Sequence, residues 1–252
     1  MHKFFAKPLF LGKKVVFLTQ CHSTNEELSS LLKNKSIPEG TIVLTDHQLN
    51  GKGQRGNTWV DEPGKSLLFS ILLKPKLLPI AKQYMLNLIS GLSVIDTITN
   101  HLQVDPKLKW PNDIYISGKK VGGILTENTV KGSKIESSIV GIGINLNQDK
   151  VLIEQGSSLL IEGRKVTDRQ SFMEDLLSSL ESWYLRLKAS KYQEIEEAYS
   201  SCMLWKDESH FFQDEHSKFN GIIRGIDEGG RLLLEKAEGN QSYDIKEIQF
   251  IS

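Results

Sequence analysis

The glycine-rich stretch GKGQRG at residues 51–56 sets the strongest constraint on the fold. It matches the G-x-G-x-x-G pattern of a dinucleotide-binding turn, in which a strand precedes the glycines and a helix begins at them. A β-branched stretch, residues 40–48, does precede the glycines, but a loop and then an apolar run at residues 66–75 follow them. The helix whose N-terminus would bind a pyrophosphate is missing, so the sequence argues against a Rossmann fold.

The same loop still suits an anion. Its glycines leave backbone N–H groups accessible to a ligand, and Lys52 and Arg55 add two positive charges. Such loops bind carboxylates and phosphates. The alternative interpretation is a surface turn whose two cations are merely solvated.

Composition excludes several classes of protein. The chain of 252 residues is 39% hydrophobic and 25% charged, which is typical of a globular protein with a sizeable core. Basic and acidic residues number 31 each, so the basic excess of a general nucleic-acid binder is missing and we expect no nucleic-acid partner. The two cysteines and six histidines show no metal-binding spacing. Without a signal peptide or a bilayer-spanning run, we predict a cytoplasmic protein with no membrane contact.

Hydrophobic periodicity predicts both strands and helices, which indicates an α+β fold. The predicted strands cover residues 14–19, 40–48, 66–75, 114–116, 121–126 and 134–147. The predicted helices cover residues 79–102, 168–189 and 192–199, and one more begins near Thr24 after a Ser23/Glu26 capping box. Short strands and turns follow from Leu204, which predicts a small β-barrel. We therefore expect two domains, residues 1–203 and residues 204–252.

Four segments occur in one order: STN at 23–25, GKGQRGNTW at 51–59, KWPNDIYISGKKVGGILTE at 109–127 and GIGINLN at 141–147. Together they resemble the catalytic domain of biotin protein ligases, and the resemblance extends over nearly the whole chain. It implies a class II synthetase-like biotin/lipoate ligase fold, in which helices flank a mixed β-sheet, with a C-terminal SH3-like barrel. Only about a dozen residues precede the first strand, so the chain resembles the monofunctional ligases that lack the DNA-binding domain of repressor-type members.

The resemblance implies a two-step reaction. Biotin attacks the α-phosphate of ATP to give biotinyl-AMP and pyrophosphate, and a lysine of a biotin carboxyl carrier domain then attacks the adenylate. Biotin and ATP would be substrates, Mg2+ would be held mainly by the ATP phosphates, and no prosthetic group would be bound tightly. The carrier would belong to acetyl-CoA carboxylase or a related carboxylase, and a homodimer is a family possibility.

The matched motifs also imply residue roles. The catalytic residues would be Lys120 as principal cation, Lys52, Arg55, and Asp113, which would position or deprotonate the carrier lysine. The biotin site would comprise Ser23, Thr24, Asn25, Gln48, Gly51, Lys52, Gly53, Lys120, Gly122, Gly123, Gly141 and Gly143. The nucleotide site would comprise Arg55, Gly56, Asn57, Trp59, Lys109, Asn112 and Asn145. From the residues alone, a capping Ser23, a core Trp59, a solvated Lys120 and a turn-capping Asp113 are the alternatives.

Two features depart from the family pattern. Lys52 stands where Arg is usual, which keeps the charge but loses the bidentate fork. The last residues, EIQFIS, carry no cation that could assist nucleotide binding.

Two other functions compete with a biotin ligase. Lipoate ligases and octanoyl transferases share the fold and the acyl transfer to a carrier lysine, but they lack the glycine loop followed by Trp. A non-catalytic biotin-binding module would have no need of Lys120, Arg55 and Asp113 around an α-phosphate. Formation of an adenylate distinguishes all three.

Overall fold

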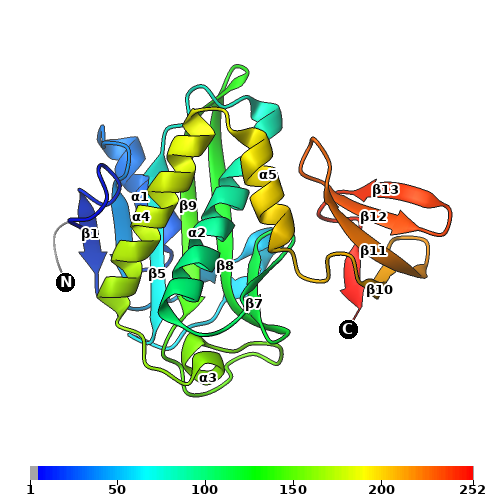
Figure 1. Ribbon diagram of the computed structural model, residues 1–252. Helices are drawn as coiled ribbons and strands as arrows, with labels where there is room; N and C mark the ends of the chain where they lie inside the picture. The colour runs from blue at the N-terminus through cyan, green and yellow to red at the C-terminus, as the bar shows by residue number, and fades with distance from the viewer. Residues whose placement is uncertain (1–4, 252) are drawn as a thin grey trace.

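The computed structural model describes residues 5–251, apart from the side chain of Arg55. It has a large mixed sheet with helices packed on it, and a second, smaller sheet beside it (Figure 1). This arrangement confirms the predicted α+β class. The division between domains after residue 203 stays a prediction.

The large sheet has seven strands in the order β1-β2-β5-β9-β8-β7-β6. Only β1 and β2 pair in parallel, and the other neighbours are antiparallel. The strands, in sheet order, are β1 (Val15–Leu18), β2 (Ile42–Thr45), β5 (Ser66–Leu73), β9 (Lys134–Asn145), β8 (Lys119–Lys131), β7 (Asp113–Ile116) and β6 (Lys107–Lys109).

Helices cover both faces of this sheet. Figure 1 shows α2 (Met85–His101), α4 (Arg169–Lys188) and α5 (Tyr192–Ser201) side by side across one face. The helix α1 (Thr24–Asn34) packs on the other face, where Leu28 joins Val43 and Leu72 in a small core cluster. Because every residue of β5 is buried, that strand reads as a continuous apolar run and not as an alternating one.

Two local predictions need correction. The predicted helix over residues 79–102 is interrupted, since a 3-10 turn, η2 (Ile80–Lys82), precedes α2. The helix α1 does begin at Thr24, but the Ser23 side chain makes no capping hydrogen bond. Its intended partner Glu26 forms an ion pair with Lys52 instead, so tertiary contact overrides the local motif. A short helix that was not predicted, α3 (Leu159–Gly163), also forms.

The small sheet contains five antiparallel strands in the order β13-β12-β11-β10-β14. They are β10 (Ser209–Gln213), β11 (Lys218–Ile226), β12 (Leu232–Lys236), β13 (Gly239–Tyr243) and β14 (Gln249–Ile251). The Trp110 indole donates a hydrogen bond of 3.0 Å to the Gly230 carbonyl in the β11–β12 turn. This contact joins the small sheet to the segment between β6 and β7. None of the helices described is long and apolar enough to cross a membrane.

We predict that Gly230→Ala weakens the junction between the sheets. Gly230 has φ +80°, and an added Cβ would lie 2.4 Å from Cγ of Tyr84. A left-handed backbone and a steric clash together cost about 2–4 kcal/mol of unfolding free energy. Calorimetric thermal unfolding measures the loss. Gly132→Ala is the matched control, since Gly132 has φ +63° and open space around it; equal losses in the two variants would contradict a role for the Tyr84 contact.

Candidate functional site

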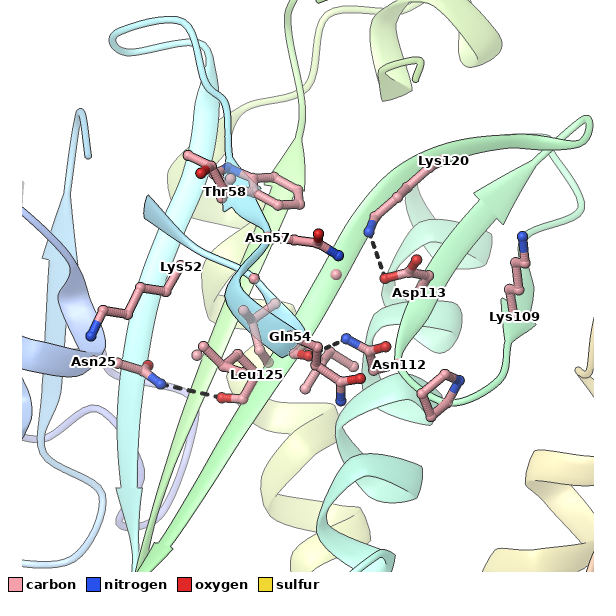
Figure 2. A pocket seen from close by; sticks show the side chains of 18 of the residues that line it. Asn25, Lys52, Gln54, Asn57, Thr58, Lys109, Asn112, Asp113, Lys120 and Leu125 are labelled. Carbon is pink, nitrogen blue, oxygen red and sulfur yellow. Dashed lines mark hydrogen bonds and ion pairs between the residues drawn. The ribbon is translucent and has the colours of Figure 1, made fainter. Parts of the chain in front are cut away.

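A cavity of about 280 Å3 lies on the sheet beneath the glycine loop. Figure 2 shows side chains from the loop, α1, β7 and β8 converging on it. Predicted site residues in its lining are Ser23, Thr24, Asn25, Gln48, Lys52, Gly53, Asn57, Trp59, Lys109, Asn112, Asp113, Lys120, Gly123, Gly141 and Gly143. The structure thus brings four sequence motifs to one cavity.

Other predicted residues lie just outside this lining. Gly51, Gly56 and Gly122 are not part of it, and the Arg55 side chain lies outside the described part of the chain. Asn145 lines a second, smaller hollow of about 60 Å3, which shares Thr58, Trp59 and Lys120 with the main cavity.

The glycine loop forms a tight ribbon over the sheet. Its two short strands, β3 (Gly51–Lys52) and β4 (Thr58–Trp59), pair antiparallel around a 3-10 turn, η1 (Gln54–Gly56). Gly53 N–H donates to the Asn57 carbonyl at 2.7 Å, and Gly56 adopts φ +83°, which favours glycine. The next α-helix along the chain is α2, so the argument against a Rossmann turn is confirmed.

One end of the cavity is a buried polar network. The Thr24 N–H and hydroxyl both point to Oε1 of Gln48, at 2.8 and 3.2 Å. The Ser70 hydroxyl lies 2.7 Å from Oγ1 of Thr24 and 2.5 Å from Oδ1 of Asn25. The Asn25 amide donates to Glu127 at 2.7 Å. These groups are oriented by one another, so this end is ready to bind a polar ligand group without rearrangement.

Ser70 was missed from the sequence. A signal existed, since Ser70 is a polar residue in the middle of the apolar run of β5. It is fully buried and holds Thr24 and Asn25 in place. Gly141 faces the same network, because a Cβ there would lie 2.4 Å from Oδ1 of Asn25.

The other end of the cavity carries charged side chains from three neighbouring strands. Lys109 of β6 lies opposite Asp113 of β7 in the strand register. The β7–β8 register shifts by one residue, so that Lys120 pairs with Tyr115. Paired residues share a face, and Asp113 and Tyr115 share theirs because they are two apart. The bulge at Val121 therefore puts Lys120 on the same face as Asp113 and Lys109.

Lys120 is held on two sides. Its ammonium lies 2.6 Å from Oδ1 of Asp113 (Figure 2). Its backbone N–H donates to Gln155 and its carbonyl accepts from Ser157. The preceding turn, Ser117 and Gly118, has φ 51° and 76°, which matches a tight hairpin. The backbone of Lys120 is thus fixed and its ammonium has a defined partner, although the side chain is still 27% exposed. Its catalytic role stays a prediction.

Lys52 lies across the cavity from this cluster (Figure 2). Its ammonium is 2.5 Å from Oε1 of Glu26, and both side chains are nearly half exposed, at 44% and 45%. The hydrogen bond and the charge of Glu26 raise the pKa of Lys52. In this arrangement Lys52 is directed to α1 and not to the Lys120 end.

Trp59 packs against the glycines of the sheet. A Cβ at Gly143 would lie 2.9 Å from its Cε2 atom, and one at Gly123 would lie 3.4 Å from its Cζ3 atom. Gly143 and Gly123 were predicted to allow close approach of biotin, and here they allow close approach of the indole. Because Trp59 lines both the main cavity and the smaller hollow, it forms part of the wall between them.

Two of the three amides predicted to bind nucleotide are already engaged with protein. Asn112 Nδ2 donates to the Ile124 carbonyl at 2.6 Å, and Asn145 Nδ2 donates to the Ser157 carbonyl at 3.0 Å. Both therefore order the segments around Lys120. The C-terminal part of the chain supplies apolar residues that were not predicted, namely Ile245 and Ile248 from the β13–β14 connection and Phe250 of β14.

Family comparison matches two parts of the chain. Residues 17–145 match the Biotin/lipoate A/B protein ligase family, and residues 212–250 match the Biotin protein ligase C terminal domain. The first range spans the seven-stranded sheet and the second falls in the small sheet.

Individual relatives agree with this match. The bifunctional ligase/repressor BirA of Bacillus subtilis is 31% identical over 242 residues, which cover 94% of this chain and 74% of the relative. The biotin–[acetyl-CoA-carboxylase] ligase of Paracoccus denitrificans is 28% identical over 243 residues, covering 92% and 99%. The structure of biotin protein ligase from Aquifex aeolicus in complex with biotin and ATP has a TM-score of 0.80 at 30% identity and covers 95% of this chain and 99% of that one. Sequence, fold and cavity agree, and this chain belongs to the biotin protein ligase family.

Proposed function

We propose that the protein activates biotin with ATP to biotinyl-5'-AMP and then transfers biotin to one lysine of a biotin carboxyl carrier domain. The observation that carries this proposal is the two-ended cavity. A buried polar network at one end suits the ureido group of biotin, and fixed cations at the other suit a carboxylate and a phosphate. The reaction requires that one biotin molecule contact the polar network with its ureido group and the cations with its carboxylate.

In the first step an oxygen of the biotin carboxylate bonds to the α-phosphorus, and pyrophosphate leaves with the electron pair of the broken P–O bond. Both reactants are anions, so cations must offset their repulsion and the charge that develops. Lys120 takes this role, because its backbone is fixed and its ammonium already faces the cavity. Asp113 holds that ammonium at 2.6 Å until the phosphate arrives.

In the second step the carrier lysine amine bonds to the acyl carbon and AMP leaves. The amine must lose a proton. Within the part of the chain that the structure describes, Asp113 is the one acidic residue in the cavity lining, so it is placed to accept that proton. Its carboxylate becomes available when Lys120 turns to the phosphate. One ion pair thereby serves both steps.

Lys52 contributes by changing partners. Its ion pair with Glu26 is solvent-exposed, and such pairs contribute little free energy. Release of Lys52 to a bound carboxylate or phosphate therefore costs little. Arg55 and Asn57 complete the loop on the nucleotide side, with Trp59 beside the adenine.

Mg2+ would enter on the phosphates of ATP. The described residues contain no group of three metal-ligating side chains. Asp113 could supply one oxygen ligand, which fits an ion held mainly by substrate phosphates and water. The metal would offset phosphate charge during pyrophosphate departure.

The carrier would dock as a folded domain along a sheet edge. The chain covers the β6 edge itself, since the Leu108 N–H donates to the Cys202 carbonyl and the Leu108 carbonyl accepts from the Leu204 N–H. The strand β1 ends the sheet on the other side, and an open edge is a surface for strand addition. We propose this edge for the carrier or for a second copy, and light scattering over a protein concentration series tests the homodimer.

Mass spectrometry of products from protein, MgATP and either biotin or lipoate tests the function. We expect biotinyl-AMP with biotin only. Lipoyl-AMP would move the assignment to the lipoate ligases. No adenylate, together with tight biotin binding by calorimetry, would indicate a binding module.

We predict that Lys120→Ala slows biotinyl-AMP formation about 10²- to 10³-fold, the usual effect of removing one electrostatic stabiliser. The fold should persist, because the backbone contacts of Lys120 do not use its side chain. Pyrophosphate release measures the rate. Lys119→Ala is the control, since Lys119 is exposed and absent from the cavity lining. A wild-type rate in Lys120→Ala would refute the assignment.

We predict that Asp113→Asn slows transfer more than activation, because the amide cannot accept the amine proton. The transfer step should fall by about 10²- to 10⁴-fold. Single-turnover reaction of pre-formed biotinyl-AMP with the carrier isolates this step from pyrophosphate release. Equal losses in both steps would show that Asp113 acts only by holding Lys120.

We predict that Gly53→Ala mainly accelerates escape of the adenylate. An added Cβ would lie 3.2 Å from the Asn57 carbonyl oxygen, which is the partner of Gly53 N–H. The ribbon would therefore close poorly, and a strain of about 1.4 kcal/mol corresponds to a tenfold faster release. Stopped-flow dissociation of biotinyl-AMP measures the rate, and an unchanged rate would count against the loop as a lid.

A further inference from the structure

The three lysines that line the cavity are held in different ways. Lys52 is paired with Glu26 at 2.5 Å, and Lys120 is paired with Asp113 at 2.6 Å. Among the residues described, Lys109 has no carboxylate within ion-pair distance. The position of the Lys109 ammonium in the cavity must therefore be stabilised by something other than a carboxylate.

Lys109 is enclosed by aromatic rings. Its ammonium lies 4.9 Å from the ring centroid of Phe250, 5.0 Å from that of Tyr115 and 5.9 Å from that of Trp205. It also donates a long hydrogen bond of 3.4 Å to the Tyr115 hydroxyl. All three rings are within the distance at which a π-face attracts a cation. We call Tyr115, Trp205 and Phe250 the aromatic cage.

The cage is assembled from distant parts of the chain. Tyr115 belongs to β7, Trp205 lies between α5 and the small sheet, and Phe250 belongs to β14. Trp205 stacks on His210 with ring centroids 4.1 Å apart, and Phe250 meets Phe212 edge-on at 5.3 Å. The small sheet thus fixes two of the three rings.

The aromatic cage differs from a carboxylate partner in that it holds the ammonium without neutralising its charge. A carboxylate would hold Lys109 but cancel its charge and compete with an anionic ligand. The ring faces hold the ammonium through their quadrupoles and leave its net charge in place. Desolvation lowers the pKa of Lys109, with Lys120 adding to the effect and Asp113 opposing it. A polyanion entering the cavity would compensate this unfavourable burial of charge.

We propose that the aromatic cage positions Lys109 as an unneutralised cation for the triphosphate of ATP, and that Phe250 of the small sheet is a positioning residue for nucleotide binding. This inference rests on the proposed function for the identity of the nucleotide. The small sheet would then contribute to nucleotide affinity through Phe250, a side chain that carries no charge.

The test is a double-mutant cycle on nucleotide affinity. Calorimetry with a non-hydrolysable ATP analogue and Mg2+ gives Kd without turnover, so a failure of adenylate formation and a failure of the cage are seen separately. Phe250→Leu, which removes the ring but keeps an apolar side chain, should raise this Kd about 3- to 30-fold. Lys109→Met should raise it at least as much.

The diagnostic result is the coupling between the two variants. Phe250→Leu should cause no further change in a Lys109→Met background, and Phe250→Tyr, which keeps an aromatic face, should retain the wild-type Kd. Neither Phe250→Leu nor Lys109→Met should change the Kd for biotin. Phe211→Leu is the matched control, since Phe211 is 60% exposed and outside the cavity lining.

Three outcomes would overturn the proposal. They are additive effects of Phe250→Leu and Lys109→Met, an equal loss in Phe250→Tyr, and an equal weakening of biotin binding. Each would mean that Phe250 supports the cavity by packing alone.

Discussion

The register of β6, β7 and β8 is the constraint on which the charged end of the cavity depends. Side chains alternate between the faces of a sheet, so a shift of one residue moves a side chain to the opposite face. The bulge at Val121 uses this rule, because it brings Lys120 opposite Tyr115 and hence onto the face of Asp113. Without the extra residue, Lys120 would point to the other face, and the ion pair with Asp113 could not form.

The charged groups of the cavity illustrate three ways of keeping a lysine near an anion site. Lys120 is paired with the carboxylate of Asp113, to which we assign the proton transfer of the second chemical step. Lys52 has an exposed carboxylate on α1 and can leave it at low cost. Lys109 has aromatic faces instead. The three arrangements differ in how much positive charge each leaves for a substrate, and only the last leaves all of it.

The glycines of the cavity follow from its packing. Gly143 and Gly123 have the Trp59 indole against them, and Gly141 has the Asn25 amide. A side chain at any of these positions would displace the group that covers it. Glycine therefore brings the loop and α1 down onto the sheet, so that groups from both line one cavity.

Much of this protein was determined by local sequence. Periodicity predicted most helices and strands, since side-chain spacing reports burial on one face, and four motifs predicted most of the residues that meet at the cavity. The tertiary structure alone decided which partners the charges take. Glu26 satisfied a capping pattern but pairs with Lys52, and Phe250 lies in a segment without cations but holds Lys109. The physical reason is that such contacts join segments far apart in the chain, and their distances depend on how layers pack, which no local pattern encodes.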